Sequence, residues 1–301
     1  MNTNTSIDTS NLDLSQIHTF KRSKRRRKVI NLLLILLVTL LGIIVAFPLY
    51  WLIRSSLVSK PEFLARPPVF FPEELLFGNY HKAIGRINFP VQLWNSISIV
   101  VPYVIGTVIT TSFAGYAFAR LRFPLSNMWF MLVISTMMLP SAVTLIPQYM
   151  MFSTFHMVGT KWPLILPAFL CSGGNGYFVF LLRQFFRTIP KELDEAACID
   201  GAGFFYIYTA IMLPLVRPAL IVVGLFSFIG CWNEFFYTLI YLQGESMFTL
   251  PLGLYMVNGL RIPNYEQVMA LTVIVTLPCL ILFLLGNKYF IKGIALSGIK
   301  G

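Results

Sequence analysis

Charged side chains are scarce in this sequence of 301 residues. Asp, Glu, Lys and Arg make up 12% of the chain, about half of the roughly 25% that is typical of soluble domains. Hydrophobic residues reach 56%, and the mean hydropathy is +0.73. This balance argues against a soluble protein and indicates that water is not the main solvent of the chain.

Motifs of catalysis and metal binding are also missing. The chain has no G-x-x-x-x-G-K-[ST] loop to cradle nucleotide phosphates, and neither H-E-x-x-H nor G-x-S-x-G. Its four cysteines stand at least 27 residues apart, without the spacing of metal ligands, and are interpreted as small buried hydrophobic residues. We therefore expect no catalytic residue, no metal site and no nucleotide site on this chain.

The sequence consists instead of long uncharged stretches that follow one another. A helix of about 20 residues is enough to cross the hydrocarbon core of a bilayer. The first stretch is longer than the core of a cleaved secretion signal and is interpreted as a retained helix. We predict an all-α membrane protein with six transmembrane helices, at residues 29–53, 93–119, 125–146, 162–182, 218–243 and 267–287.

Small residues and helix breakers predict how these helices pack. Gly106 and Gly115 in the second stretch allow neighbouring helices to approach closely. Pro140 is expected to break the third helix, and the run of residues 172–176 is expected to weaken the fourth. Broken backbone at membrane depth must be covered by protein or line a cavity. We therefore expect the fourth helix to face inward.

The positions of the basic residues predict the orientation of the chain. Seven Lys and Arg residues lie between positions 21 and 28, and the net charge is +11. With six spans, 16 of the 23 Lys and Arg residues fall on the same side as both termini, as expected of the cytoplasmic side. We predict a cytoplasmic basic arm at residues 1–28, a six-helix domain at 29–292 and a cytoplasmic tail at 293–301. The charge is attributed to an anionic membrane surface and not to nucleic acid.

One cytoplasmic loop, residues 183–217, is long enough to have a structure of its own. Pro190 followed by three acidic residues predicts the start of a short helix, and Gly201 with Gly203 predicts its end. Apolar residues at helical spacing predict a second short helix, ended by a proline. These residues are Phe204, Ile207, Tyr208, Ile211 and, at the end, Pro214. A helix resting on lipid headgroups carries Lys and Arg on its polar face, whereas the first helix here is acidic, which favours a docking element.

The same loop carries the residues of a known motif. It reads Glu195-Ala196-Ala197, then Gly201 after three residues, then Ile211-Met212-Leu213-Pro214 after nine more. This pattern resembles the EAA loop of the permease subunits of ABC importers. Further matches to the carbohydrate-uptake branch, and to the smaller permease of maltose-type transporters, are Asp200, Ala202, Pro218, the run Trp232-Asn233-Glu234-Phe235 and a glycine-bearing C-terminal tail.

The resemblance implies a type I importer permease fold in the cytoplasmic membrane of a prokaryote. It also implies a heterodimer with a homologous second permease, two ATPase subunits that hold ATP and Mg, and an extracytoplasmic sugar-binding protein. Residues 183–217, called the coupling loop below, would dock on an ATPase subunit, and the chain itself would be neither an enzyme nor a cofactor-binding subunit. The docking residues would be Glu195, Ala196, Ala197, Asp200, Gly201, Ala202, Ile211, Leu213 and Pro214.

Four residues are candidates for the substrate pathway. Glu234 is the only acidic residue in a predicted span, where a carboxylate costs a few kcal/mol. It either faces the pathway, bonds to a neighbouring helix or borders the wet outer interface. Asn233 would diverge from it by about 100° on a continuous helix, and we expect the amide to face the cavity because it can both donate to and accept from sugar hydroxyls. Trp232 and Gln148 complete the set, with packing as the alternative for Gln148.

An ion-coupled secondary transporter is the alternative function. Such a protein should carry several ionisable residues within its spans and often an internal repeat. The single intramembrane carboxylate and the lack of an obvious repeat favour the importer permease.

Overall fold

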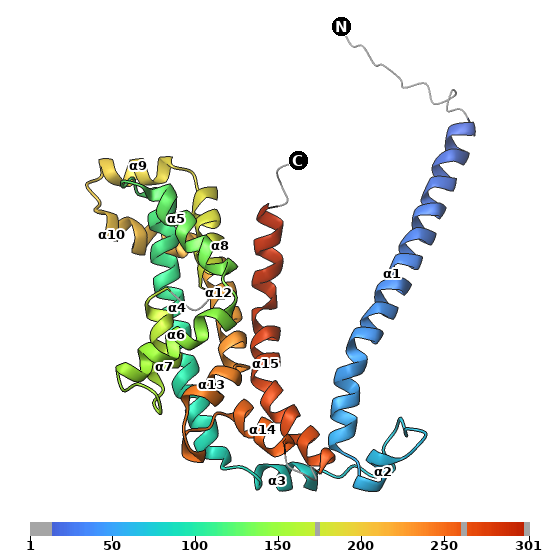
Figure 1. The fold of residues 1–301 in the computed structure, drawn as a ribbon. Helices are drawn as coiled ribbons and strands as arrows, with labels where there is room; N and C mark the ends of the chain where they lie inside the picture. The colour runs from blue at the N-terminus through green and yellow to red at the C-terminus, as the bar shows by residue number, and fades with distance from the viewer. Residues whose placement is uncertain (1–13, 172–174, 260–263, 298–301) are drawn as a thin grey trace. The chain divides into compact units, whose positions relative to one another are not determined.

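Helices are the only regular secondary structure in the part of the chain that the computed structural model describes, residues 14–171, 175–259 and 264–297 (Figure 1). The prediction of an all-α protein is confirmed for these residues. The chain divides into two compact units, Met1–Ser55 and Ser56–Gly301, and each is described by itself below.

The first unit is built on a single long helix. Helix α1, Leu14–Ser56, has 43 residues and begins within the basic arm, ahead of the predicted start at residue 29. Neither Gly nor Pro interrupts the chain between Leu14 and Leu41, so nothing ends the helix at the charged segment. Its apolar side chains from Val29 to Val45 are exposed, as expected of a helix whose solvent is lipid.

Helix α4, Phe89–Arg120, is the centre of the second unit. It packs against α7 (Trp162–Phe169), α8 (Gly176–Thr188) and α12 (Arg217–Trp232), and α12 packs in turn against α15 (Tyr265–Ser297). The other helices of this unit are α2 (Lys60–Leu64), α3 (Gly78–Ile84), α5 (Ser126–Ser135), η2 (Thr136–Met138), α6 (Ser141–Thr154), α9 (Glu192–Ile199), α10 (Phe204–Tyr206), η3 (Ile207–Met212), α11 (Leu213–Leu215), α13 (Phe236–Tyr241), η4 (Glu245–Met247) and α14 (Leu250–Asn258).

Two glycines allow α4 to lie close to its neighbours. A Cβ atom added to Gly106 would stand 2.8 Å from the ring of Phe169 in α7, and one added to Gly115 would stand 2.9 Å from Cβ of Leu182 in α8. Both distances are too short for carbon atoms in contact. The close approach predicted for these two positions is confirmed.

Six membrane-spanning helices are not confirmed. In the described part of the chain, three helices are long and apolar enough to span a membrane: Lys28–Ser56, Phe89–Arg120 and Tyr265–Lys288. Two bent pairs would each make one more span, Ser126–Met138 with Ser141–Thr154, bent by 102°, and Phe204–Leu215 with Arg217–Trp232, bent by 79°. The described helices therefore provide three spans, or up to five if each bent pair crosses once.

The predicted third, fourth and fifth helices are each divided in the structure, and only the break of the fifth was not predicted. Leu139 has an extended conformation (φ −76°, ψ 119°), as the residue before a proline prefers, so the third helix bends at Pro140. The fourth is divided into α7 and α8, and residues 172–174 between them lie outside the described residues. The fifth is divided into α12 and α13, with residues 233–235 between them.

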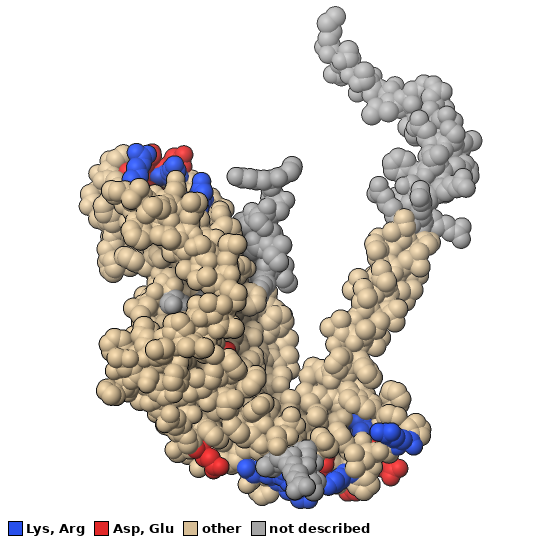
Figure 2. All heavy atoms as spheres, viewed as in Figure 1, with Lys and Arg blue, Asp and Glu red and all other residues tan. Residues whose placement is uncertain are grey.

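Charged side chains of the second unit gather at its two ends. Figure 2 shows one group over α9 and another around α3, with a broad surface of uncharged side chains between them. Helix α4 runs from one end to the other (Figure 1), so its last residue, Arg120, lies near α9. This distribution is typical of a protein whose middle lies in lipid and whose ends are in water.

Candidate coupling loop and substrate pathway

Helix α9 (Glu192–Ile199) is the first helix that lies wholly within the coupling loop, because residues 183–188 are the last turns of α8. Three acidic side chains stand in its first turn, where negative charge stabilises a helix N-terminus. It ends at Gly201, whose φ of +80° is left-handed. In this conformation the Gly201 N–H donates to the Cys198 carbonyl (3.1 Å) and the Ala202 N–H donates to the Ala197 carbonyl (2.9 Å). These two bonds satisfy the last carbonyls of α9, and the predicted glycine stop is confirmed.

The second part of the loop is helical as predicted, but not as one regular helix. It passes from α10 through the wider π turn of η3 into α11. The helical run ends at Leu215, one residue beyond the predicted terminator Pro214. Pro214 is thus the last residue but one of the run, close to the predicted end.

One face of the coupling loop packs against three longer helices of the second unit. Ile207, Tyr208 and Met212 are buried in a core with residues of α4, α8 and α12. The Tyr208 hydroxyl lies 2.7 Å from the hydroxyl of Ser112 in α4, and the Tyr208 ring lies 5.2 Å from that of Tyr116, centroid to centroid. The second half of the loop is therefore fixed directly to α4.

The other face of the loop is exposed and largely apolar. Glu195, Ala196, Asp200 and Gly201 are exposed, whereas Ala197 is buried and Ala202 is half-buried. Large side chains are also uncovered there: Ile199 is 87% exposed, Phe204 68%, Phe205 71% and Tyr206 62%. Phe204 shares the predicted helical spacing with Ile207 and Tyr208, but it is exposed whereas those two side chains are buried. The rest of the predicted set lies in part against the core: Ile211 and Leu213 are half-buried, and Pro214 is exposed.

Arg120, at the end of α4, is a contact of the loop that sequence reasoning missed. Its Nη1 lies 2.9 Å from Oδ2 of Asp194 in α9, and the Arg120 side chain is 5% exposed. Burial raises the pKa of the Asp194 carboxyl above its ordinary value, Arg120 opposes this by lowering the pKa, and nearby Glu195 adds to the rise. A lone arginine beside a proline-containing turn gives no sequence signal of such a pair, because the two residues are 74 positions apart.

The break between α12 and α13 contains two of the predicted pathway residues. Asn233 is exposed, and its Nδ2 donates to the Ile229 carbonyl (2.9 Å), which leaves its Oδ1 as an acceptor. Glu234 is half-buried, and its Oε1 accepts from the Tyr237 N–H (2.9 Å) in the first turn of α13. The carboxylate thus starts the new helix, in the place where an acidic side chain is most favourable. The expected divergence of about 100° assumed a continuous helix, which the structure does not have.

The other two pathway candidates, Trp232 and Gln148, have different surroundings from Asn233 and Glu234. Trp232 is 3% exposed, its Nε1 donates to the Val275 carbonyl in α15 (2.9 Å), and its ring stacks on Phe228. It is a core residue that joins α12 to α15. Gln148 is half-buried on α6, next to Tyr149, whose ring stacks on Tyr241 of α13.

An exposed aromatic pair adjoins the helix break. The ring of Phe235 stacks on that of Tyr255 in α14, with centroids 5.0 Å apart. Phe235 is 39% exposed and Tyr255 is 48% exposed. The sequence indicated Phe235 as a neighbour of Asn233, but Tyr255 was not indicated, because its place beside the break depends on how α14 folds back.

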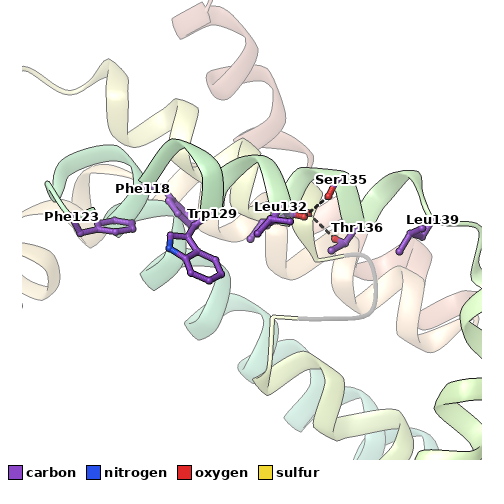
Figure 3. A pocket seen from close by; sticks show the side chains of 8 residues that line it. Phe118, Phe123, Trp129, Leu132, Ser135, Thr136 and Leu139 are labelled. Carbon is purple, nitrogen blue, oxygen red and sulfur yellow. Dashed lines mark hydrogen bonds between the residues drawn. The ribbon is translucent and has the colours of Figure 1, made fainter. Parts of the chain in front are cut away.

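An open groove along α5 and η2 has a volume of about 800 Å³ (Figure 3). It is lined by Phe118, Phe123, Trp129, Leu132, Val133, Ser135, Thr136 and Leu139. The hydroxyls of Ser135 and Thr136 donate to carbonyls of their own helix turn. A sugar needs several hydrogen-bond partners, so we do not place the substrate in this apolar groove.

Comparison with known proteins gives a consistent result. Residues 108–295 match the family described as "Binding-protein-dependent transport system inner membrane component". The trehalose/maltose transport system permease protein MalG of Thermococcus litoralis is 33% identical over 275 residues, which cover 90% of this chain and 97% of that protein. The arabinooligosaccharides transport system permease protein AraQ of Halalkalibacterium halodurans is 30% identical over 281 residues, covering 92% of this chain and 99% of that protein.

The fold also matches a solved structure. A chain of a bacterial ABC transporter involved in the import of the acidic polysaccharide alginate superposes with a TM-score of 0.75 at 22% identity, covering 89% of this chain and 98% of that chain. The type I importer permease fold predicted from the sequence is confirmed at this level, without the number of spans.

Proposed function

The chain belongs to the family of binding-protein-dependent transport system inner membrane components, and we propose that its cargo is a sugar or oligosaccharide. Two relatives of nearly full coverage are named for the transport of trehalose and maltose and of arabinooligosaccharides. An importer permease is driven by ATP hydrolysis on partner subunits, so this chain provides the path and the moving helices and no covalent chemistry.

The observation that carries the proposal is the two-sided coupling loop. One face is fixed to α4 through Ser112, Tyr116 and Tyr208, and the other exposes Ile199, Phe204, Phe205 and Tyr206. Large apolar groups uncovered at a charged end of the molecule mark a surface that a protein partner covers. An ATPase subunit that binds here would move α4 whenever it moves the loop.

In the proposed assembly, this chain pairs with a homologous second permease, two ATPase subunits with ATP and Mg, and an extracytoplasmic sugar-binding protein. The complex lies in the lipid bilayer of a prokaryotic cytoplasmic membrane. Residues 29–292 would form a six-helix domain between the cytoplasmic arm 1–28 and the cytoplasmic tail 293–301. The coupling loop would then face the cytoplasm, where ATP is available.

The proposed substrate contacts lie at the break between α12 and α13. Oδ1 of Asn233 can accept from a sugar hydroxyl, and the exposed Phe235–Tyr255 stack can cover the apolar face of a sugar ring. Glu234 supports this arrangement by holding the first turn of α13. Gln148 on α6 remains a candidate for the same pathway, and Trp232 is left out because its side chain is in the core.

Reconstitution of the assembled transporter tests the function. The tagged chain, purified from membranes that express its transport partners, should retain ATPase subunits. In liposomes with the binding protein outside and ATP inside, radiolabelled maltose, trehalose or an arabinooligosaccharide should accumulate. Uptake that needs no ATP and collapses with a protonophore would instead establish the ion-coupled alternative.

A mutational arm tests the pathway within the same vesicles. Asn233→Ala and Tyr255→Ala should weaken uptake while the subunits remain assembled. Phe205→Ala, on the coupling loop, should weaken retention of the ATPase subunits. Loss of subunit assembly by Asn233→Ala would show that Asn233 serves packing and not the substrate.

A further inference from the structure

Arg120 joins three separate elements at the end of α4. Its Nη1 pairs with Asp194 of α9 at 2.9 Å, and its Nη2 donates to the carbonyls of Phe186 (2.6 Å) and Ile189 (2.5 Å) at the end of α8. The planar guanidinium can serve these acceptors at once because its donors form a rigid fork. The last turn of α4 is thus tied to the end of α8 and to α9.

Helix α9 has little else to hold its orientation. Of its eight residues only Ala197 is buried, so apolar packing does not determine where the helix points. The second half of the loop is different, since Ile207, Tyr208 and Met212 anchor it in the core. The position of α9 relative to α4 therefore depends on the pair between Arg120 and Asp194.

The opposite end of α4 is tied to a second loop. Nδ2 of Asn95 donates to the carbonyls of Ser246 (2.8 Å) and Phe248 (3.1 Å), and the Ser96 hydroxyl accepts from the Leu250 N–H (2.9 Å) at the start of α14. Asn95 and Ser96 are buried. A helix rises 1.5 Å per residue, so the 25 residues from Asn95 to Arg120 separate the two ties by about 38 Å.

We propose that α4 is a rod clamped at both ends, and that Arg120 is the positioning residue that passes a displacement of α9 into it. A displacement of α9 reaches the guanidinium through Asp194, moves the end of α4 together with that of α8, and arrives at the loop ahead of α14 through Asn95 and Ser96. The path also runs backwards, because coupling between two sites is reciprocal. The proposal rests on the proposed function, since α9 is taken to be the docking helix.

The test uses the complete transporter in liposomes and three variants. Arg120→Gln breaks the clamp. Arg120→Gln with Asp194→Asn also removes the carboxylate that the single variant leaves half-buried without its arginine. Arg122→Gln is the matched control, because Arg122 is exposed and stands two residues away. Subunit assembly, thermal melting, sugar taken up per ATP hydrolysed, and stimulation of ATP hydrolysis by sugar-loaded binding protein are measured for each.

We expect Arg120→Gln to lower the sugar taken up per ATP by about fivefold or more, the lower end of typical allosteric coupling, and to reduce stimulation by the binding protein. The double variant should regain the melting temperature and assembly of the wild type but remain uncoupled. Arg122→Gln should behave as the wild type. Normal coupling in either Arg120 variant would overturn the proposal, because a merely structural role would be repaired in the double variant.

The far clamp gives an independent readout. Asn95→Ala should reduce stimulation of ATP hydrolysis by the binding protein while the ATPase subunits stay bound at the coupling loop. Unchanged stimulation would overturn the role of α4 as a rod. A wild-type complex that takes up no sugar with ATP would overturn the proposed function itself, whereas uptake with normal coupling in the variants would overturn only the clamp.

Discussion

Gly201 is the position at which a single methyl group should report how the coupling loop works. Its φ is +80°, and a Cβ atom added there would meet nothing within 4 Å. Gly203, two residues later, is equally open but has an ordinary extended conformation (φ −75°, ψ 161°). Replacement by Ala therefore adds the same atom to the same exposed turn, and only at Gly201 does it add backbone strain.

The magnitude follows from the left-handed conformation. A residue with a Cβ atom pays about 1–2 kcal/mol in this region, which corresponds to roughly a 5- to 30-fold smaller population of the correctly closed turn. In Gly201→Ala the turn would relax, and the bonds from the Gly201 and Ala202 N–H groups to the end of α9 would be lost. Asn tolerates left-handed φ better than other residues, so Gly201→Asn should be the mildest substitution.

The assay is the affinity of the purified permease pair, in nanodiscs, for the isolated ATPase subunit, measured beside ATP-driven uptake. Gly201→Ala should weaken binding about 5- to 30-fold, whereas Gly203→Ala should leave it unchanged. Equal effects of the two Ala variants would refute the argument from backbone strain. A larger loss in Gly203→Leu than in Gly203→Ala would reveal a close-fitting ATPase cleft, because strain is absent at that position.

Three further predictions concern the side of the membrane, the loop carboxylate and the helix break. A variant whose only cysteine is Cys198, which is exposed, should react with an impermeant maleimide in inside-out vesicles and not in intact cells; labelling of intact cells would contradict a cytoplasmic coupling loop. Burial raises the pKa of Asp194 above its ordinary 3.8, and Arg120 opposes the rise. The Asp194 carboxyl therefore stays protonated to a higher pH in the folded loop than in the unfolded chain. Its contribution to stability falls as the pH rises from 3.8 through the folded pKa. Arg120→Gln should move the pH midpoint of the infrared carboxyl band of Asp194 still higher. Trp232→Phe should lower the melting temperature through loss of the bond to Val275, worth about 1 kcal/mol, with little effect on the substrate affinity of transport. Asn233→Ala should instead weaken the substrate affinity of transport and leave the melting temperature nearly unchanged.

Helix breaks show where prediction from sequence reached its limit. Pro140 was recognised as a breaker, and the chain bends there by 102°. The break at residues 233–235 was not predicted, because Trp232, Asn233 and Glu234 are all compatible with a helix interior. It arises where Trp232 is held by Val275 of α15 and Glu234 begins α13. Contacts of this kind are between helices and leave no local pattern in the sequence.

The coupling loop divides in the same way. Its two short helices, the acidic first turn and the glycine stop followed from residue types alone, because charge at a helix end and left-handed φ are local effects. The side of the loop that faces the core did not follow, because Phe204 has the same helical spacing as Ile207 and Tyr208 but is exposed while they are buried. The π turn of η3 changes the angular spacing of residues, so a regular helical period no longer predicts which side chains are buried.

Composition and local pattern were thus enough to predict the apolar surroundings of this protein, its helical class, its family and the two short helices within residues 183–217. These properties depend on composition, on the length of apolar stretches and on a motif whose residues are close in the chain. Only the tertiary structure decided that Trp232 belongs to the core, that Tyr255 lies beside the helix break and that Arg120 meets Asp194. Each of these depends on residues at least 20 positions apart, and only the packing of α4, α9, α12, α14 and α15 brings them within contact distance.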